Sequence, residues 1–101
     1  MMHMVSYRLK PDRVAENERL AAAVYDALRK ARPPGLRYAT FRLEDGVSFI
    51  HIVAQEEADG SNALTALPAF KAFASGVKER CEVLPARVEL ATIGSYGFFD
   101  E

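Results

Sequence analysis

Alternation of apolar and polar residues marks three segments of the chain as β-strands. The first covers residues 3–9, ends before Pro11, and has one face made by His3, Val5, Tyr7 and Leu9. Two further β-rich runs lie within residues 36–57. The sequence EDG at residues 44–46 separates them as a tight hairpin turn would, so we expect these two strands to be antiparallel neighbours.

Apolar residues at spacings of three and four predict two amphipathic helices. The first follows Asp12, which stands at the N-cap position, and stops at RPPG, residues 32–35, because two prolines and a glycine break a helix. The second follows the turn residues ADGSN at 58–62 and carries a stripe of Leu67, Phe70, Ala74, Val77 and Cys81. After Pro85, residues 88–93 are expected to form the last strand.

The order of the predicted elements is β-α-β-β-α-β, and it fills residues 1–101 as a single domain. Right-handed crossovers fold this order into a four-stranded antiparallel sheet with both helices on one face, which is the ferredoxin-like arrangement. Neither an internal repeat nor a linker interrupts the pattern. The fold class is therefore expected to be α+β.

The strand around residue 51 is apolar on both of its faces. Phe49 and Val53 point one way, and Ile50 and Ile52 point the other. Two helices on one side of a sheet cover only one of these faces. We therefore expect a second copy of the chain to cover the open face, because the sequence shows no second domain that would do so.

Composition narrows the class of protein without giving a function. Hydrophobic residues make up 50% of the chain and charged residues 27%, which is typical of a globular domain. The net charge of −1, with scattered basic residues, gives no reason to expect nucleic acid as a partner. No run approaches the ~20 apolar residues of a membrane span, and Cys81 is the only cysteine. We therefore expect a cytoplasmic protein with no disulfide and no place in a membrane.

The stretches MVSYRL, FRLEDGVSFIHIVAQEE and LPAFKAF resemble the dimeric α+β barrel superfamily, and within it the antibiotic biosynthesis monooxygenase-like domains. The likeness covers nearly the whole chain, and LPAFKAF at residues 67–73 is similar to a stretch of the family's second helix. The resemblance implies a homodimer in which the helix-free sheet faces pack together. We expect the C-terminal segment to extend this contact, because it includes Tyr96, Phe98 and Phe99.

Better-known members of this family oxidise small aromatic or polyketide-like molecules without metal or flavin, so the resemblance implies a cofactor-independent monooxygenase. Related barrels degrade haem, isomerise lactones or only bind small molecules. This chain has no Trp, and neither of its two His residues lies in the predicted second helix, where many members place one. A non-catalytic protein that binds a small molecule or responds to stress is therefore the alternative function. A structural dimer whose cavity is filled by its own phenylalanines is the third.

His51 and His3 are the only imidazole groups, and they lie on strands that are expected to be neighbours. A neutral imidazole accepts a proton near pH 7, so His51 is predicted to act as a general base or to orient a ligand. His3 is the second candidate catalytic residue. The alternatives for His51 are a half-buried side chain hydrogen-bonded to a neighbour and a side chain within the dimer interface. Tyr7 and Tyr38 are candidates to orient an oxygenated ligand through their hydroxyl groups, and the alternative for both is an amphipathic side chain at the sheet edge or at the rim of the dimer.

Aromatic residues of the hairpin and the second helix are predicted to line a pocket for a small aromatic ligand. The assigned side chains are those of Phe49, Phe70 and Phe73, with Phe41 beside them. Core packing alone is the alternative explanation for all four. Two His residues and scattered carboxylates lack the spacing of a metal site, so neither a metal nor another cofactor is expected.

Overall fold

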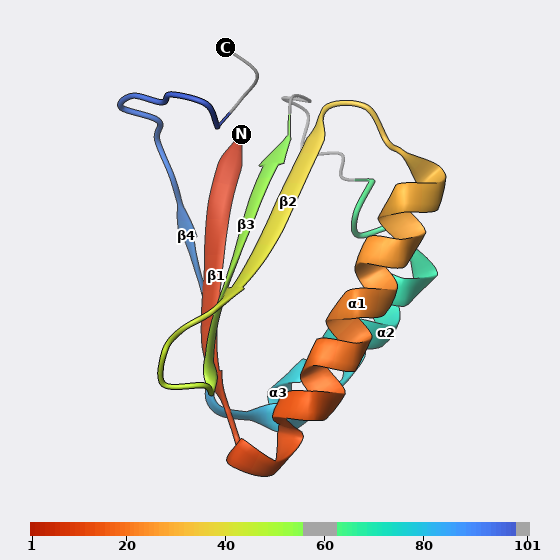
Figure 1. Ribbon diagram of the computed structural model, residues 1–101, viewed down its shortest axis with the longest axis vertical. Coiled ribbons are helices and arrows are strands. Elements are labelled where there is room, and N and C mark those ends of the chain that lie inside the picture. Colours follow the sequence, from red (N-terminus) through yellow and green to blue (C-terminus); the bar gives the residue numbers. More distant parts are fainter. Residues whose placement is uncertain (56–62, 99–101) are drawn as a thin grey trace.

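A four-stranded antiparallel sheet stands on one side of the molecule, and the helices pack on one of its faces (Figure 1). This is a computed structural model, and it describes residues 1–55 and 63–98. The strand order across the sheet is β2-β3-β1-β4, and the strands are β1 (Met2–Leu9), β2 (Leu36–Arg42), β3 (Ser48–Gln55) and β4 (Cys81–Glu89). The helical elements are η1 (Pro11–Arg13), α1 (Val14–Ala31), α2 (Pro68–Ser75) and α3 (Val77–Arg80). The predicted α+β fold is confirmed.

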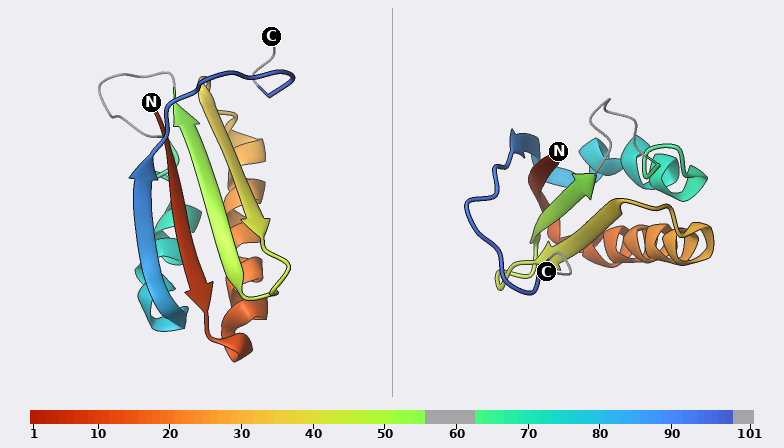
Figure 2. Two further views of the ribbon diagram at one scale, coloured as in Figure 1. Left: turned by 90° about the vertical axis from the view of Figure 1, so that its left-hand side faces the viewer. Right: turned by 90° about the horizontal axis from the view of Figure 1, so that it is seen from above.

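Strand pairing decides which side chains face the helices. β1 pairs with β3 so that Val5 lies opposite His51 and Tyr7 lies opposite Phe49. Opposed residues of an antiparallel pair point to the same side of the sheet. In Figure 2 the helices lie along one face only, and the other face carries no helix. Tyr7 and Leu9 of β1 and Phe49, His51 and Val53 of β3 are buried on the helical side.

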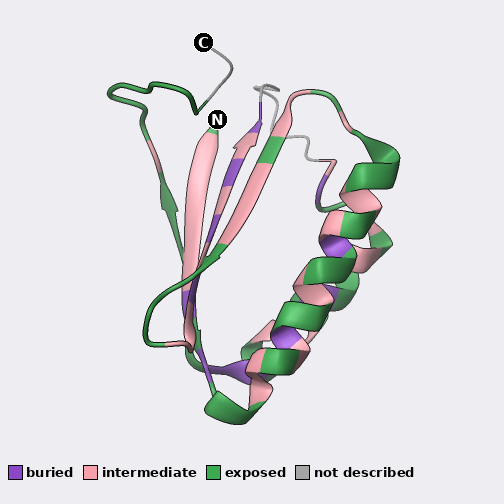
Figure 3. Cartoon of the chain, viewed as in Figure 1, coloured by how far each residue is buried: buried purple, intermediate pink, exposed green. Residues whose placement is uncertain are grey.

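The hydrophobic core lies between the sheet and the helices, and Figure 3 colours its buried positions on the strands and on the helices. Its buried apolar residues are Tyr7, Leu9, Val24, Phe49, Val53, Leu64, Phe73 and Cys81. Two polar side chains, Asn17 at 0% exposure and Arg80 at 1%, are as deeply buried as these apolar residues. Buried polar groups of this kind are stable only when their hydrogen bonds are satisfied, so both point to a specific internal network.

The predicted second helix is wrong at its C-terminal end. α2 ends at Ser75, and after Gly76 only the single turn of α3 follows before β4 begins. A Cβ atom at position 76 would lie 3.0 Å from an Arg80 guanidinium nitrogen, so the small residue leaves room for that side chain at the break. Cys81 is therefore the first residue of β4 rather than the last of a helical stripe.

The predicted last strand is also displaced, because β4 covers Cys81–Glu89 rather than residues 88–93. Pro85 lies inside β4, although proline has no amide hydrogen to donate to a neighbouring strand. It is accommodated because β4 is an edge strand and its pairing with β1 shifts register between Ser6 and Arg8. The sequence predicts a break at this proline, whereas an irregular edge strand tolerates it.

The N-terminal boundary of the first helix differs from the prediction as well. Asp12 lies within η1, and α1 starts at Val14 after Arg13, whose side chain makes no capping hydrogen bond. Pro11 begins the short 3-10 turn, where its fixed φ angle and missing amide hydrogen are tolerated. The turn expected at residues 58–62 lies outside the described residues. Among the helices of the described residues, none is long and apolar enough to cross a membrane.

Cys81 is expected to react slowly with a maleimide in the native protein and about 100-fold faster after unfolding in urea. Its side chain is 7% exposed, and burial raises the pKa of its thiol, so little reactive thiolate reaches solvent. The measurement is the labelling rate by mass spectrometry with and without urea. Equal rates in the two conditions would show that the start of β4 opens readily.

Candidate functional site

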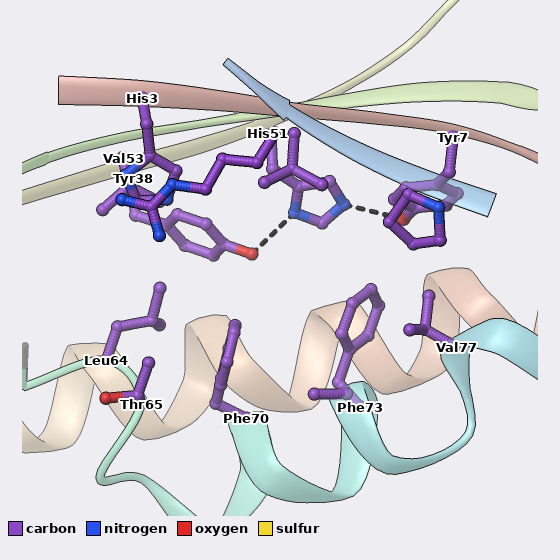
Figure 4. Close-up of a pocket in the computed structure, with 14 residues that line it drawn as sticks. His3, Tyr7, Tyr38, His51, Val53, Leu64, Thr65, Phe70, Phe73 and Val77 are labelled. Atoms are coloured by element: carbon purple, nitrogen blue, oxygen red, sulfur yellow. Dashed lines mark hydrogen bonds between the residues drawn. The ribbon is translucent and has the colours of Figure 1, made fainter. Parts of the chain in front are cut away.

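A cavity of about 260 Å³ lies between the sheet and α2 (Figure 4). Polar groups line it only from the strand side in the close-up, apart from the hydroxyl of Thr65. The strand-side residues that could act in catalysis or bind a ligand by hydrogen bonds are His3, Tyr7, Tyr38 and His51. The opposite wall is mostly apolar and includes Leu64, Phe70, Phe73 and Val77. An apolar chamber with a few convergent polar groups is the usual form of a small-molecule site.

His51 lies at the centre of the polar wall and is 5% exposed. The Tyr7 hydroxyl is 2.7 Å from its Nε2 atom, and the Tyr38 hydroxyl is 2.6 Å from its Nδ1 atom (Figure 4). Burial lowers the pKa of His51 to about 4, because the charged imidazolium is poorly solvated there. The ring is therefore neutral at pH 7, with both nitrogens engaged by tyrosine hydroxyls.

Both tyrosines are protonated at neutral pH. Burial raises the pKa of Tyr7 to about 12 and raises the pKa of Tyr38 as well. The Tyr38 ring also stacks on Tyr25, with centroids 5.3 Å apart, and the Tyr25 hydroxyl lies 2.7 Å from the Thr40 hydroxyl. These contacts hold Tyr38 in place, so its hydroxyl group is a fixed hydrogen-bonding group at the cavity wall.

The network continues behind the cavity through residues that the sequence analysis missed. Asn17 Nδ2 donates to the Tyr7 hydroxyl at 3.0 Å, and Arg80 Nε donates to Asn17 Oδ1 at 3.0 Å. Arg80 also donates to the Phe73 carbonyl oxygen at 2.8 Å, and its guanidinium lies 5.0 Å from the Phe73 ring centroid. The sequence held a signal for Asn17. It stands three residues before Leu20 and seven before Val24, so it falls on the apolar face of the predicted first helix, where a buried polar side chain is unusual.

The structure brings most of the predicted site residues together. His3, Tyr7, Tyr38 and His51 share one cavity with Phe70 and Phe73. Phe49 does not line this cavity; it stacks on the Tyr7 ring at 5.7 Å and supports it from the core. Phe41 lies on the opposite face of the sheet and is 50% exposed. The prediction that it stands beside the aromatic residues of the pocket is therefore wrong.

His3 is the second imidazole of the cavity and is less buried than His51. It lies opposite Val53 on β3, which places it two residues along the same face from the Val5 and His51 pair. Burial lowers its pKa, and the positive charge of Arg87 lowers it further. Within residues 1–55 and 63–98, no group of three or more His, Cys, Asp or Glu side chains is placed to hold a metal ion.

No family model and no curated protein matches this sequence. Solved structures do match it. An antibiotic biosynthesis monooxygenase has a TM-score of 0.73 and 13% identity, with 93% of this chain and 100% of that chain covered. A protein from Mycobacterium tuberculosis has a TM-score of 0.75 and 17% identity, with 93% and 95% covered. A variant of SnoaB, a cofactor-independent oxygenase from Streptomyces nogalater, has a TM-score of 0.70 and 18% identity, with 95% of each chain covered.

These matches cover nearly the whole chain and each of the compared chains. The chain therefore has the ferredoxin-like fold of the antibiotic biosynthesis monooxygenase domain proteins, which confirms the predicted resemblance at the level of the fold. Identities of 13% to 18% do not extend the likeness to the residues of the cavity. The chemistry of the site must be derived from this chain's own side chains.

Proposed function

We propose that this chain binds a small planar molecule with a phenol or enol oxygen in the cavity beside His51 and oxidises it without a cofactor. The observation that carries the proposal is the Tyr7, His51 and Tyr38 network, which lines an otherwise mainly apolar chamber. Support also comes from the fold, which is similar to that of a cofactor-independent oxygenase. The chamber of about 260 Å³ suits a ligand of two or three fused rings only if part of the ligand extends toward solvent.

In the proposed reaction the substrate supplies its own electrons. Loss of a proton from an activated CH₂ carbon next to the enol system gives a carbanion, and dioxygen takes two electrons as the new C–O bond forms. Protonation gives a hydroperoxide, which loses water and leaves a carbonyl group. The apolar wall removes water from the anion, and the Tyr38 hydroxyl stabilises its oxygen.

The two imidazoles have different roles in this proposal. His51 is a weak base, since its pKa is about 4, and its two nitrogens already contact tyrosine hydroxyls. It therefore orients the ligand through Tyr38. His3 is the less buried imidazole of the same cavity, and we propose it as the group that accepts the substrate proton.

A non-catalytic binding or stress-responsive protein is the second candidate function. The specific observation in its favour is that both ring nitrogens of His51 are occupied, which suits the recognition of a ligand better than proton transfer. The two functions require the same bound ligand class and differ only in turnover. Dioxygen uptake in the presence of anthrone separates them, because binding without uptake assigns the non-catalytic function.

Replacing Tyr38 with phenylalanine is expected to weaken 1-naphthol binding about tenfold, which corresponds to the loss of one hydrogen bond. His51→Gln is expected to have a similar effect, since Tyr38 loses its partner. Isothermal titration calorimetry measures the affinity, and circular dichroism checks the fold. Tyr96→Phe is the matched control at a site that is 94% exposed, and it is expected to bind as the unaltered chain does. If neither 1-naphthol, 4-nitrophenol nor anthrone binds the unaltered chain, the proposed ligand class is wrong.

We also propose that two copies of the chain pair through the helix-free face of the sheet. Ile50, Ile52 and Ala54 of β3 point to this face, and Val88 of β4 is 47% exposed on it. A second cavity of about 470 Å³ separates the face from residues 90–98. In that segment Ile93, Tyr96 and Phe98 are 98%, 94% and 78% exposed, so an apolar surface continues from the sheet onto the segment.

A second copy of the same chain is the proposed occupant because a twofold axis lets one apolar patch cover its equivalent. Such a pairing is consistent with the C-terminal segment reaching across the partner's sheet. Phe99, which was expected to take part, lies outside the described residues. A cytoplasmic location and the absence of a nucleic-acid partner stay predictions from composition.

A further inference from the structure

Two buried side chains behind the cavity fix the direction of the hydrogen bonds inside it. Asn17 and Arg80 do not line the cavity, and both are almost completely inaccessible to solvent. The guanidinium of Arg80 can only donate hydrogen bonds, and its Nε atom lies 3.0 Å from Asn17 Oδ1. The amide of Asn17 is therefore oriented with its oxygen toward Arg80 and its nitrogen toward Tyr7.

The orientation of Asn17 determines each following bond. Its amide nitrogen can only donate, so the Tyr7 oxygen accepts that bond at 3.0 Å. The single hydroxyl hydrogen of Tyr7 is then directed to His51 Nε2 at 2.7 Å. A neutral imidazole that accepts at Nε2 carries its hydrogen on Nδ1. His51 Nδ1 therefore donates to the Tyr38 oxygen at 2.6 Å.

The last hydrogen in this series of hydrogen bonds is that of the Tyr38 hydroxyl group. A hydrogen bond with Thr40 lowers the pKa of Tyr38 against the larger effect of burial, so Thr40 is the donor in it and the Tyr38 oxygen accepts. Thr40 Oγ1 also lies 3.2 Å from His51 Nδ1 and 2.7 Å from the Tyr25 hydroxyl. A ligand oxygen in the cavity can then take the Tyr38 hydrogen.

We propose that Arg80 and Asn17 are positioning residues that hold His51 in the tautomer with hydrogen on Nδ1, and so make Tyr38 a hydrogen-bond donor to a ligand oxygen. The ligand class that fits is a phenolate or enolate, because an anionic oxygen accepts hydrogen bonds whereas a neutral phenol also competes as a donor. The ligand part of this inference rests on the proposed function. The tautomer part does not, since it concerns the free protein.

The positively charged groups near the cavity also favour an anionic ligand. The positive charge of Arg80 stands at the start of the chain of donors, and Arg87 lines the cavity from β4. His3 also lines the cavity and is held toward its neutral form by burial. Burial lowers the pKa of Arg80, the negative charge of Glu16 offsets part of this effect, and Glu89 pairs with Arg87. The donors therefore point toward the ligand, with the buried cation behind them.

Asn17→Asp is a near-isosteric change that is expected to reverse the direction of the hydrogen bonds between residue 17 and Tyr38. An aspartate still accepts from Arg80, but it cannot donate to Tyr7, so the Tyr7 hydrogen turns toward the new carboxylate. The Tyr7 oxygen then accepts from His51 Nε2, and His51 moves to the tautomer with hydrogen on Nε2. Tyr38 in turn donates to Nδ1 and has no hydrogen left for a ligand.

Nitrogen-15 NMR of the histidine rings measures the tautomer directly, and a merely structural role for Asn17 would not exchange one tautomer for the other. The chain has two histidines, and a His3→Asn variant assigns the remaining signal to His51. We expect hydrogen on Nδ1 in the unaltered chain and on Nε2 in Asn17→Asp. Hydrogen on Nε2 in the unaltered chain overturns the inference, and so does an unchanged tautomer in the variant. If Asn17→Asp does not fold, Tyr7→Phe replaces it and is expected to populate both tautomers.

The ligand arm uses 4-nitrophenol, whose phenolate absorbs visible light. Bound to the unaltered chain, it is expected to ionise about one pH unit lower than in free solution, which is a tenfold preference for the phenolate. Tyr38→Phe is expected to remove this shift while His51 keeps its hydrogen on Nδ1. Asn17→Asp is expected to change both the ionisation of the bound dye and the tautomer of His51. Arg87→Gln measures the direct contribution of the charge in the cavity wall, and the shift lost with Tyr38→Phe is expected to exceed the shift lost with Arg87→Gln. Failure of the dye to bind counts against the proposed function, whereas binding without a shift overturns only the role of Tyr38.

Discussion

Lysine in place of Ile52 is expected to leave the protein monomeric at concentrations where the unaltered chain is expected to form the proposed dimer. Ile52 lies on the helix-free face of β3, paired with Met4 on β1 and Ala39 on β2. It is therefore in the middle of the open face rather than at the edge of the sheet. A charge placed there meets the partner's apolar surface in any pairing of the two sheets.

The expected weakening of dimerisation is at least about 100-fold, or roughly 2.7 kcal/mol. A twofold interface contains the substitution twice, so two ammonium groups must be accommodated in an apolar contact. The proposed interface has at least the standard size of roughly 1,600 Å², in which the buried centre is depleted of charged residues. Ending the chain after Gly94 removes Tyr96 and Phe98 and is expected to weaken the dimer less, because the sheet contact remains.

Size-exclusion chromatography with light scattering measures the mass over a range of concentrations. Ala22→Lys on the exposed side of α1 is the matched control, since it adds the same charge on another side of the molecule. Val88→Lys tests the same face from β4, where the side chain is already 47% exposed and the fold is at little risk. A stable monomer of the unaltered chain at micromolar concentration would contradict the proposed dimer.

Acidification from pH 7 to pH 4 is expected to lower the free energy of unfolding by about 3 kcal/mol through His51 alone. The pKa of His51 falls from 6.5 to about 4 in the folded protein. Between these two values the unfolded chain binds a proton that the folded protein does not, so stability falls as the pH falls. Well above pH 6.5 both states are neutral at this residue and the effect vanishes.

Urea unfolding at a series of pH values measures this dependence. Carboxylate groups also titrate near pH 4, so the relevant quantity is the difference between the unaltered chain and His51→Gln, which does not titrate. The variant is expected to be less stable at pH 7, because its partners Tyr7 and Tyr38 lose a well-placed imidazole, but to lose less stability on acidification. His3→Asn is the control and should keep most of the dependence. Identical slopes for the unaltered chain and His51→Gln would show that His51 is protonated as easily as in water.

Local patterns predicted the parts of the fold that depend on neighbours in sequence. Alternation along residues 3–9 placed Tyr7 on the face that the structure buries, and the EDG sequence marked the hairpin between β2 and β3. The pattern also put Phe49 and Val53 on one face, and because side chains alternate strictly along a strand, His51 between them falls on that face. The order of elements then left few topologies, so the sheet and its helical cover followed from the sequence.

Contacts between segments far apart in the sequence decided the rest. Arg80 and Asn17 are 63 residues apart, and their bond exists only because α1 packs beside the helices that follow residue 67. Pro85 could remain in a strand because β4 became an edge strand with a register shift, which no local signal reveals. The sequence by itself therefore determined the elements, their order and the face on which His51 lies. Only the tertiary structure decided that two tyrosines, an asparagine and a buried arginine form one hydrogen-bond network with that histidine, because hydrogen-bond partners are chosen by packing in space and not by spacing along the chain.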